Sequence, residues 1–225
     1  MRAGRLTWLF PFRLKAQAFK EVSYTPLKTL FGLFAPDTGR VKVRIYQKGE
    51  GGQPLEILNL RKTGNCKWTG SMQGNLEGLF YTFDAGYGET PGIFAQAVGV
   101  NGKRGAIIDM KSTNPPDWNK DKRPNLQSPA DLVIYELHFR DFSIDSSSGL
   151  AHKGKFLALT DHKAVDYLHS LGVNAIHILP SFDFASIDET KLNIPQYNWG
   201  YDPLNYDVPE GSYSTNPYDP SIRIR

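Results

Sequence analysis

The sequence predicts two kinds of fold in one chain of 225 residues: an antiparallel β-sandwich, followed by a parallel strand–helix–strand unit. Short strands separated by turns, with no helical period, extend from Val22 to about Met110, and this spacing is typical of a sandwich. A strand, a helix and a second strand follow from Leu132, an order that begins a parallel sheet. The boundary is an irregular connector over residues 112–130, marked by Pro115, Pro116, Pro124 and Pro129.

Composition is that of a globular protein, with 40% apolar and 12% aromatic residues. The net charge of +3 is small and the basic residues are scattered, so we expect no nucleic-acid partner. No apolar run approaches the roughly 18 residues needed for a membrane span, so we expect no membrane partner. Cys66 is the only cysteine, which excludes an internal disulfide. Residues 1–20 are expected to be a basic extension whose apolar stretch is too short for a secretory signal. We therefore predict a cytoplasmic location.

Alternation identifies the clearest strand of the sandwich. Val41, Val43 and Ile45 alternate with more polar residues, the period of a half-buried strand. Asn101-Gly102 predicts a hairpin, with residues 105–109 returning behind it. The other expected strands are Thr29–Phe34, Leu55–Leu60, Gly78–Phe83 and Ile93–Val100.

The second half begins with an expected strand over residues 132–139. Thr160 is expected to cap a helix that Gly172 ends, and residues 173–179 form the next strand. Everything after this strand is expected to be loop. The prolines of the connector surround Trp118, which we expect to pin the connector to one of the two domains.

A run of aromatic residues, Tyr197 to Tyr213, contains four tyrosines and a tryptophan together with prolines and glycines. This mixture predicts an ordered loop rather than a helix or regular strand. Flat rings displayed on a loop suit a sugar ring. The alternative is a surface loop whose rings pack onto the domain.

The heptapeptide YNWGYDP, residues 197–203, resembles the signature of type I pullulanases, glycoside hydrolases of the α-amylase superfamily that cleave α-1,6-glucosidic links. Residues 134–143 resemble the first barrel strand of these enzymes, residues 178–189 the end of the second strand with its loop, and residues 209–213 a following motif. The resemblance implies that residues 131–225 begin a (β/α)8 TIM barrel that is truncated after its second strand.

Residues 21–111 resemble, through weaker motifs, the immunoglobulin-like module of carbohydrate-binding type that precedes this barrel. Those motifs are the strand from Thr29 to Pro36, Trp68 and residues 78–83. Trp68, Tyr81 and Tyr87 are either stacking platforms for sugar or packed side chains, and packing is the simpler interpretation for each.

Function follows from the resemblance. It implies part of a debranching enzyme that acts on α-glucans (pullulan, glycogen, amylopectin or limit dextrins) by a retaining mechanism and without a cofactor. Such hydrolysis needs two carboxylic groups, which in the superfamily follow later strands. We therefore expect the catalytic carboxylates beyond residue 225 and an inactive fragment. The alternatives are a non-catalytic α-glucan-binding or scaffold remnant and a related debranching or branching enzyme.

The substrate-binding residues implied by the resemblance lie in the aromatic loop. Tyr201 would stack on the glucose ring next to the scissile bond, and Asn198, Trp199 and Asp202 would shape the same wall. Trp199 fits equally a buried anchor of the loop. The remaining acidic candidates are interpreted as structural hydrogen-bonding groups, as is Asp202: Glu136, Asp141 and Asp183.

No metal site is predicted, because His138 lacks neighbours with ligand spacing. No Gly-x-Ser-x-Gly elbow indicates a serine nucleophile either. Two strands of an eight-stranded barrel cannot close, so we expect a folded sandwich with a loose or aggregating C-terminal part.

Overall fold

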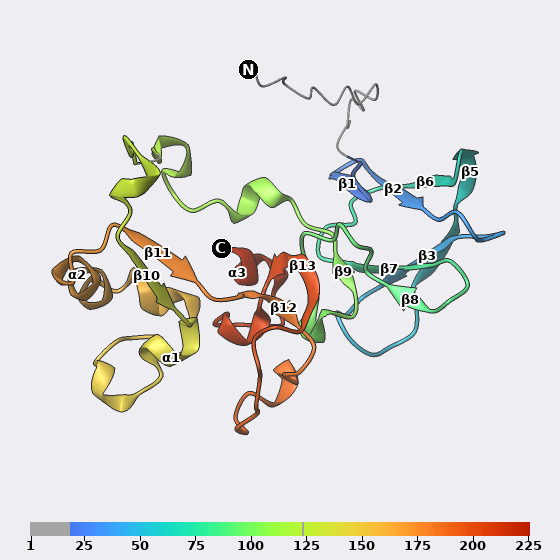
Figure 1. Cartoon of the computed structure of the whole chain (residues 1–225). Coiled ribbons are helices and arrows are strands. Elements are labelled where there is room, and N and C mark those ends of the chain that lie inside the picture. The colour runs from blue at the N-terminus through green and yellow to red at the C-terminus, as the bar shows by residue number, and fades with distance from the viewer. Residues whose placement is uncertain (1–18, 123) are drawn as a thin grey trace, which may run out of the picture.

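The computed structural model describes residues 19–122 and 124–225, which are mostly β-structure with three α-helices. The expected basic extension therefore lies outside the described residues, apart from Phe19 and Lys20. The N-terminal half forms one side of the molecule and the strand–helix–strand unit the other, with the C-terminal segment between them (Figure 1).

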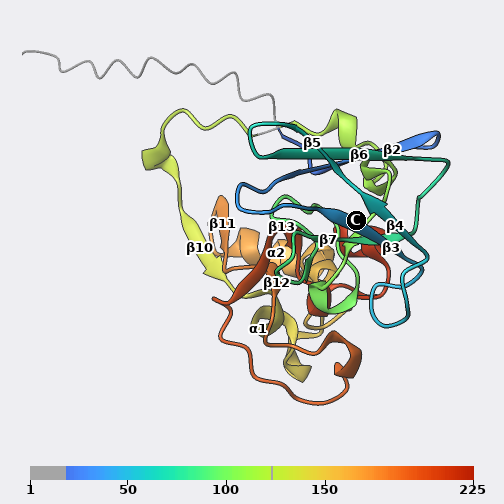
Figure 2. The same cartoon turned by 90° about the vertical axis from the view of Figure 1, so that its right-hand side faces the viewer.

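Two antiparallel sheets form the N-terminal half and lie one above the other (Figure 2). The first contains, in spatial order, β1 (Val22–Thr25), β2 (Lys28–Phe34), β6 (Lys67–Gln73) and β5 (Arg61–Gly64). The second contains β4 (Glu56–Asn59), β3 (Lys42–Tyr46), β7 (Phe80–Asp84) and β8 (Glu89–Thr90), and β9 (Gly105–Ala106) also pairs with β7. The predicted β-sandwich is therefore present.

The core of the sandwich is made by side chains from both sheets, among them Phe31, Trp68, Met72, Val43, Ile45, Tyr81 and Phe83. The indole of Trp68 also donates a hydrogen bond to the carbonyl of Ala35 at 3.1 Å. Packing is thus the correct interpretation of Trp68 and Tyr81. It is wrong for Tyr87, whose ring is 84% exposed although its hydroxyl donates to the carbonyl of Asp37.

One predicted strand is wrong. Residues 93–100 form no strand, and only Val98 makes an isolated bridge, with Gly105. Ala95 and Val98 are buried instead against Val208 of the C-terminal half. Their apolar character therefore reflects contact between the two halves of the molecule rather than membership of a sheet.

The connector lacks the expected anchor. Trp118 lies in a short 3-10 helix (Trp118–Lys120) and is exposed. Two other 3-10 helices, Met110–Thr113 and Pro129–Asp131, stand at the two ends of this segment.

A parallel pair, β10 (Ile134–Leu137) and β11 (Ala175–Ile178), is joined through α2 (His162–Ser170), as predicted. The helix is capped by Asp161, whose carboxylate accepts from the amide of Lys163, so the expectation of Thr160 as the cap is wrong by one residue. Gly172 ends the helix with φ of 72°, a left-handed conformation that favours glycine. The first strand is shorter than expected, because α1 (Phe139–Ser143) begins directly after it.

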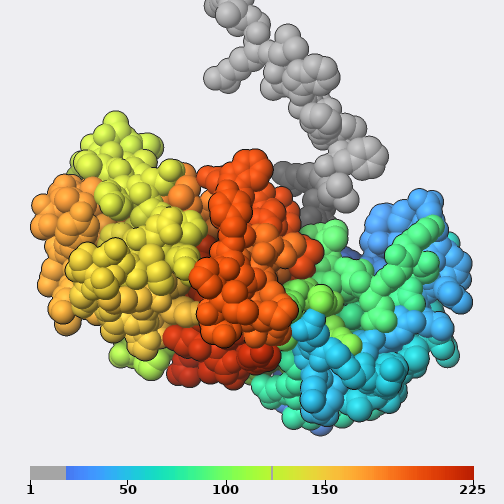
Figure 3. Space-filling view, turned by 90° about the horizontal axis from the view of Figure 1, so that it is seen from below, coloured from blue at the N-terminus to red at the C-terminus, as the bar shows by residue number. Residues whose placement is uncertain are grey.

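The segment after β11 is not the continuous loop that the prolines suggested. It contains the antiparallel pair β12 (Phe182–Phe184) and β13 (Pro203–Pro209), then α3 (Pro220–Ile224). The prolines of β13 stand at its two ends, where a missing amide costs least. In the space-filling view this segment, orange to red, lies between the other two parts (Figure 3).

Within residues 19–122 and 124–225, no helix combines the length and apolar character needed to span a membrane.

Candidate functional site

The aromatic loop, residues 197–203, displays its rings to solvent. Trp199 is 74% exposed and Tyr201 58% exposed, and their ring centroids lie 6.4 Å apart at an interplanar angle of 58°. Tyr197 is exposed as well. This exposure contradicts both the packed-down interpretation of the loop and the buried-anchor interpretation of Trp199. Of the four tyrosines in the wider run, only Tyr213 is buried.

The loop brings the side chains of Asn198 and Asp202 together. The amide of Asn198 donates to Asp202 Oδ1 at 3.1 Å and to the hydroxyl of Ser186. These bonds close the loop at the level of Trp199 and Tyr201. The two polar residues therefore tie the loop together on either side of Trp199 and Tyr201.

A second set of bonds fixes the approach to the loop. The side chain of Gln196 accepts from the amide of Asp188 at 2.7 Å and donates to the carbonyls of Asp188 and Lys191 at 3.0 and 3.2 Å. The carboxylate of Asp188 also binds Lys191 Nζ at 2.7 Å. The hydrogen bond to Lys191 is the largest cause of a lowered pKa of Asp188, so this carboxylate is charged at neutral pH.

The C-terminal segment contains a buried polar cluster that we call the Arg223 network: Arg223, Asp183, Glu189, Asn205 and Glu210. The guanidinium of Arg223, from α3, binds Glu189 Oε1 at 2.7 Å and the carboxylate of Asp183. It also donates to the carbonyls of Pro209 at 2.7 Å and Gly99 at 3.1 Å. Buried charges persist only when they are paired in this way.

Burial sets the protonation of these carboxyl groups. It is the largest cause of a raised pKa at Asp183 and Glu189, which the charge of Arg223 opposes. Burial, followed by the charge of Glu189, raises the pKa of Glu210 to about 7. Single ligand atoms of the three carboxylates lie within 4.8 Å of one another. Because Arg223 already supplies the positive charge, we assign no metal ion to the cluster.

The sandwich reaches this network through the turn of residues 99–102. The amide of Asn101 donates to Glu189 Oε2 at 2.8 Å, and Asn101 Oδ1 accepts from the amide of Glu189 at 2.8 Å. The carbonyl of Gly102 accepts from Asn205 Nδ2 at 3.1 Å. The predicted Asn-Gly turn is therefore present, and it contacts the other half of the molecule.

Other residues noted in the sequence lie apart from the loop. His138 caps α1 through Nδ1, and its Nε2 lies 2.9 Å from the hydroxyl of Tyr213. Glu136 binds His177 at 2.9 Å on the surface, and Asp141 is exposed 3.6 Å from His138. The structural interpretation of Asp183 is confirmed by its burial in the Arg223 network.

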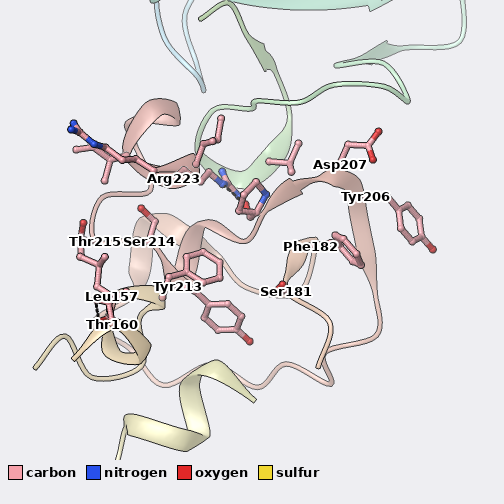
Figure 4. Close-up of a pocket in the computed structure, with 16 residues that line it drawn as sticks. Leu157, Thr160, Ser181, Phe182, Tyr206, Asp207, Tyr213, Ser214, Thr215 and Arg223 are labelled. Carbon is pink, nitrogen blue, oxygen red and sulfur yellow. Dashed lines mark hydrogen bonds between the residues drawn. The ribbon is translucent and has the colours of Figure 1, made fainter. Parts of the chain in front are cut away.

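A cavity of about 750 Å³ opens between β12, β13 and α3, lined by apolar side chains such as Phe156, Phe182 and Ile222 and by Tyr206 and Tyr213 (Figure 4). The aromatic loop does not line it. Arg223 reaches its wall, but the guanidinium is engaged with Asp183 and Glu189. Thr160, Ser181, Asp207 and Thr215 add polar groups to this mostly apolar wall.

Known proteins resemble this chain in sequence and in structure. No family model matches the chain. The pullulanase of Bacillus subtilis is 36% identical over 213 residues, which cover 89% of this chain and 29% of that protein. A crystal structure of the pullulanase from Paenibacillus barengoltzii, in complex with maltohexaose and α-cyclodextrin, superposes with a TM-score of 0.87 at 42% identity over 92% of this chain and 34% of its own. The chain belongs to the pullulanase family. The structure of the pullulanase from Bacillus acidopullulyticus is similar as well, with a TM-score of 0.81 and 37% identity over 89% of this chain and 26% of its own.

The chain thus spans about a third or less of the pullulanases that it matches. Within it, the sequence located the aromatic loop but missed the Arg223 network. Glu189, Glu210 and Arg223 stand far apart in the chain and follow no period. The only local signal was a charged residue between two isoleucines, at Arg223, and that pattern also occurs on exposed helices.

Proposed function

We propose that this chain forms part of a pullulanase-like debranching enzyme and that its aromatic loop binds α-glucan. The observation that carries the proposal is the pair of exposed, adjacent rings of Trp199 and Tyr201 within a chain of the pullulanase family. The P. barengoltzii pullulanase is described in complex with maltohexaose and α-cyclodextrin. The substrates proposed here are pullulan, glycogen, amylopectin and limit dextrins.

In this proposal Tyr201 stacks on a glucose ring, and Trp199 extends the apolar wall beside it. Sugars present apolar C–H faces and polar edges, so a ring pair flanked by hydrogen-bonding groups recognises both. Asn198 and Asp202 supply those polar groups while they hold the loop. Preorganisation of this kind lowers the entropy lost on binding.

No catalytic carboxylate is assigned within the described residues. Asp183, Glu189 and Glu210 are buried in the Arg223 network, and Asp202 is bonded to Asn198. A retaining glycosidase needs an acid and a nucleophile about 5 Å apart on opposite sides of the scissile bond. We propose that these groups lie beyond residue 225 and that the 225 residues alone do not hydrolyse glucans.

We also propose the division into domains that the resemblance to pullulanases implies. In this division residues 21–111 form an immunoglobulin-like module of carbohydrate-binding type, residues 112–130 a linker, and residues 131–225 the start of a (β/α)8 barrel. The two-sheet sandwich and the parallel β10–β11 pair support this division. The cytoplasmic location stays a prediction, which fractionation of the source cells would test.

A non-catalytic α-glucan-binding protein is the competing function. In its simplest form, with Trp68 and Tyr81 as the platforms, it fails because both rings are in the core of the sandwich. Tyr87, which is exposed, is the remaining candidate platform on that domain. The two functions therefore predict different sensitive residues.

Calorimetric titration of the 225-residue chain with maltohexaose tests the proposal. Tyr201→Ala and Trp199→Ala should each weaken binding by about tenfold or more, the usual cost of truncating a central aromatic contact. Tyr87→Ala, an equally drastic change at an exposed ring, should leave the affinity unchanged. Binding that depends on Tyr87 but not on Tyr201 would support the sandwich-binding alternative instead.

A further inference from the structure

We propose that Asn101, in the sandwich, is a positioning residue for the aromatic loop, so that the sandwich sets the affinity of the loop for α-glucan. This inference rests on the proposed function, because it assumes that the loop is the glucan-binding element. It adds a role for a residue that touches no ring of the loop. Asn101 lies 88 residues before Glu189, its main partner.

The contact between Asn101 and Glu189 is reciprocal. Asn101 and Glu189 exchange two hydrogen bonds, each of 2.8 Å, between the amide of one residue and the side chain of the other. Asn101 Nδ2 also donates to Asp188 Oδ1 at 3.3 Å and to Glu50 Oε2 at 3.1 Å. The Asn101 side chain therefore joins the connection between β3 and β4, at Glu50, to Asp188 and Glu189 in the segment between β12 and β13.

The backbone of the turn is left-handed at two successive residues. Asn101 has φ of 60° and Gly102 φ of 65°, the left-handed region that glycine and asparagine tolerate best. A Cβ atom placed on Gly102 would lie 2.3 Å from Asp183 Oδ2 and 2.8 Å from Asn205 Nδ2. The turn is thus inserted against β12 and β13, and this close approach requires glycine at residue 102.

Hydrogen bonds also link the turn to the chain on either side of the aromatic loop. Asp188, which Asn101 contacts, is held by the side chain of Gln196, and Gln196 is the residue before the aromatic loop. At the other end of the loop Asn205, in β13, donates to the carbonyl of Gly102. The turn therefore contacts the chain on both sides of Trp199 and Tyr201, and rigid support of this kind fixes a binding geometry.

The test uses Asn101→Gly in the whole 225-residue chain. Glycine keeps the left-handed backbone and the amide bond to Glu189, and it removes only the side-chain bonds to Glu50, Asp188 and the amide of Glu189. Loss of such bonds should weaken maltohexaose binding by about three- to tenfold. Hydrogen exchange followed by mass spectrometry should become faster over residues 186–202 in the free protein, while exchange in β2 and β6 stays unchanged.

Asn125→Gly is the matched control, because Asn125 is exposed in the connector, and it should change neither readout. Asn101→Asp is a second variant: it keeps the acceptor for the amide of Glu189 but places a carboxylate beside Glu50, Asp188 and Glu189, so its effect should equal or exceed that of glycine.

The outcomes separate this inference from the proposed function. If Tyr201→Ala abolishes binding but Asn101→Gly changes neither affinity nor exchange over residues 186–202, Asn101 is not a positioning residue and the inference falls alone. If exchange over residues 186–202 rises in Asn101→Gly while the unaltered chain binds no maltohexaose, the positioning role stands and the proposed function falls. Faster exchange throughout the sandwich would reduce Asn101 to a general stabilising residue and overturn the inference.

Discussion

The sandwich and the parallel β10–β11 pair contain similar apolar residues but bury them to different extents. In the sandwich, Val43 and Phe83 are fully buried between two sheets. In the parallel pair, Ile134 is 58% exposed and Ile176 38% exposed, and Leu137 is the one buried residue of the two strands. Strands of a parallel sheet are normally covered on both faces. The sandwich thus buries its apolar side chains between its own two sheets, whereas the parallel pair leaves apolar side chains exposed within the described residues.

The largest expected difference is in the cost of removing an apolar side chain. Phe83→Ala should lower the free energy of unfolding by about 3–5 kcal/mol, because it leaves a cavity in a closed core. Ile176→Ala should cost less than about 1.5 kcal/mol, because its side chain is already partly in water. Urea unfolding followed by circular dichroism measures both. Equal losses would show that the parallel pair is as well packed in solution as the sandwich.

The stability of the folded chain should depend on pH through the buried carboxyl group of Glu210. The folded state keeps the proton of Glu210 up to a pKa of about 7, whereas the ordinary value is 4.5. Between these values the folded state binds more protons than the unfolded state, so stability should fall as pH rises, by roughly 3 kcal/mol, and level off above pH 7. Urea midpoints from pH 5 to pH 8 measure the trend.

Glu210→Gln is the control for this trend, since an amide cannot lose the proton. It should flatten the dependence of stability on pH. A smaller dependence should remain from Asp183 and Glu189, whose pKa values burial also raises. An unchanged slope would place the titrating group elsewhere.

The smallest effect concerns the cap of α2. Asp161→Ala removes the acceptor of the Lys163 amide and should cost about 1 kcal/mol. Thr160→Ala is the matched change: its hydroxyl donates to the carbonyl of Leu157 instead of capping the helix, so it should cost less. Amide exchange within α2 reports both. If the Asp161 variant also accelerated exchange in the sandwich, the two regions would unfold as one unit, and the contrast between them would be weaker than the exposures indicate.

Local chemistry made part of this fold predictable. The alternation of Val41, Val43 and Ile45 identified a strand because one face of that strand is buried, and Gly172 identified the end of α2 because its φ is positive. The same rules failed where burial came from a distant segment. Ala95 and Val98 looked like a strand because they are buried by Val208.

Some residues of the candidate site could likewise be predicted from the sequence and others could not. Trp199 and Tyr201 could be found from sequence because their loop carries a recognisable motif and its own prolines and glycines. Glu189, Glu210 and Arg223 could not, because a charged residue usually indicates an exposed position. Only the tertiary fold, which brings α3 against the 99–102 turn, makes these charges buried partners.

Gly102 also bears on how the two halves could be recombined. Any other residue there would place a Cβ atom 2.3 Å from the carboxylate of Asp183, so a foreign sandwich joined to this C-terminal half would need the same Asn-Gly pair at the same place in its hairpin. A chimera that lacked the pair would lose the Asn101–Glu189 hydrogen bonds and the close approach of the turn to Asp183. The sandwich is therefore not a freely exchangeable module, and successful grafts should be limited to donor domains that bring this dipeptide with them.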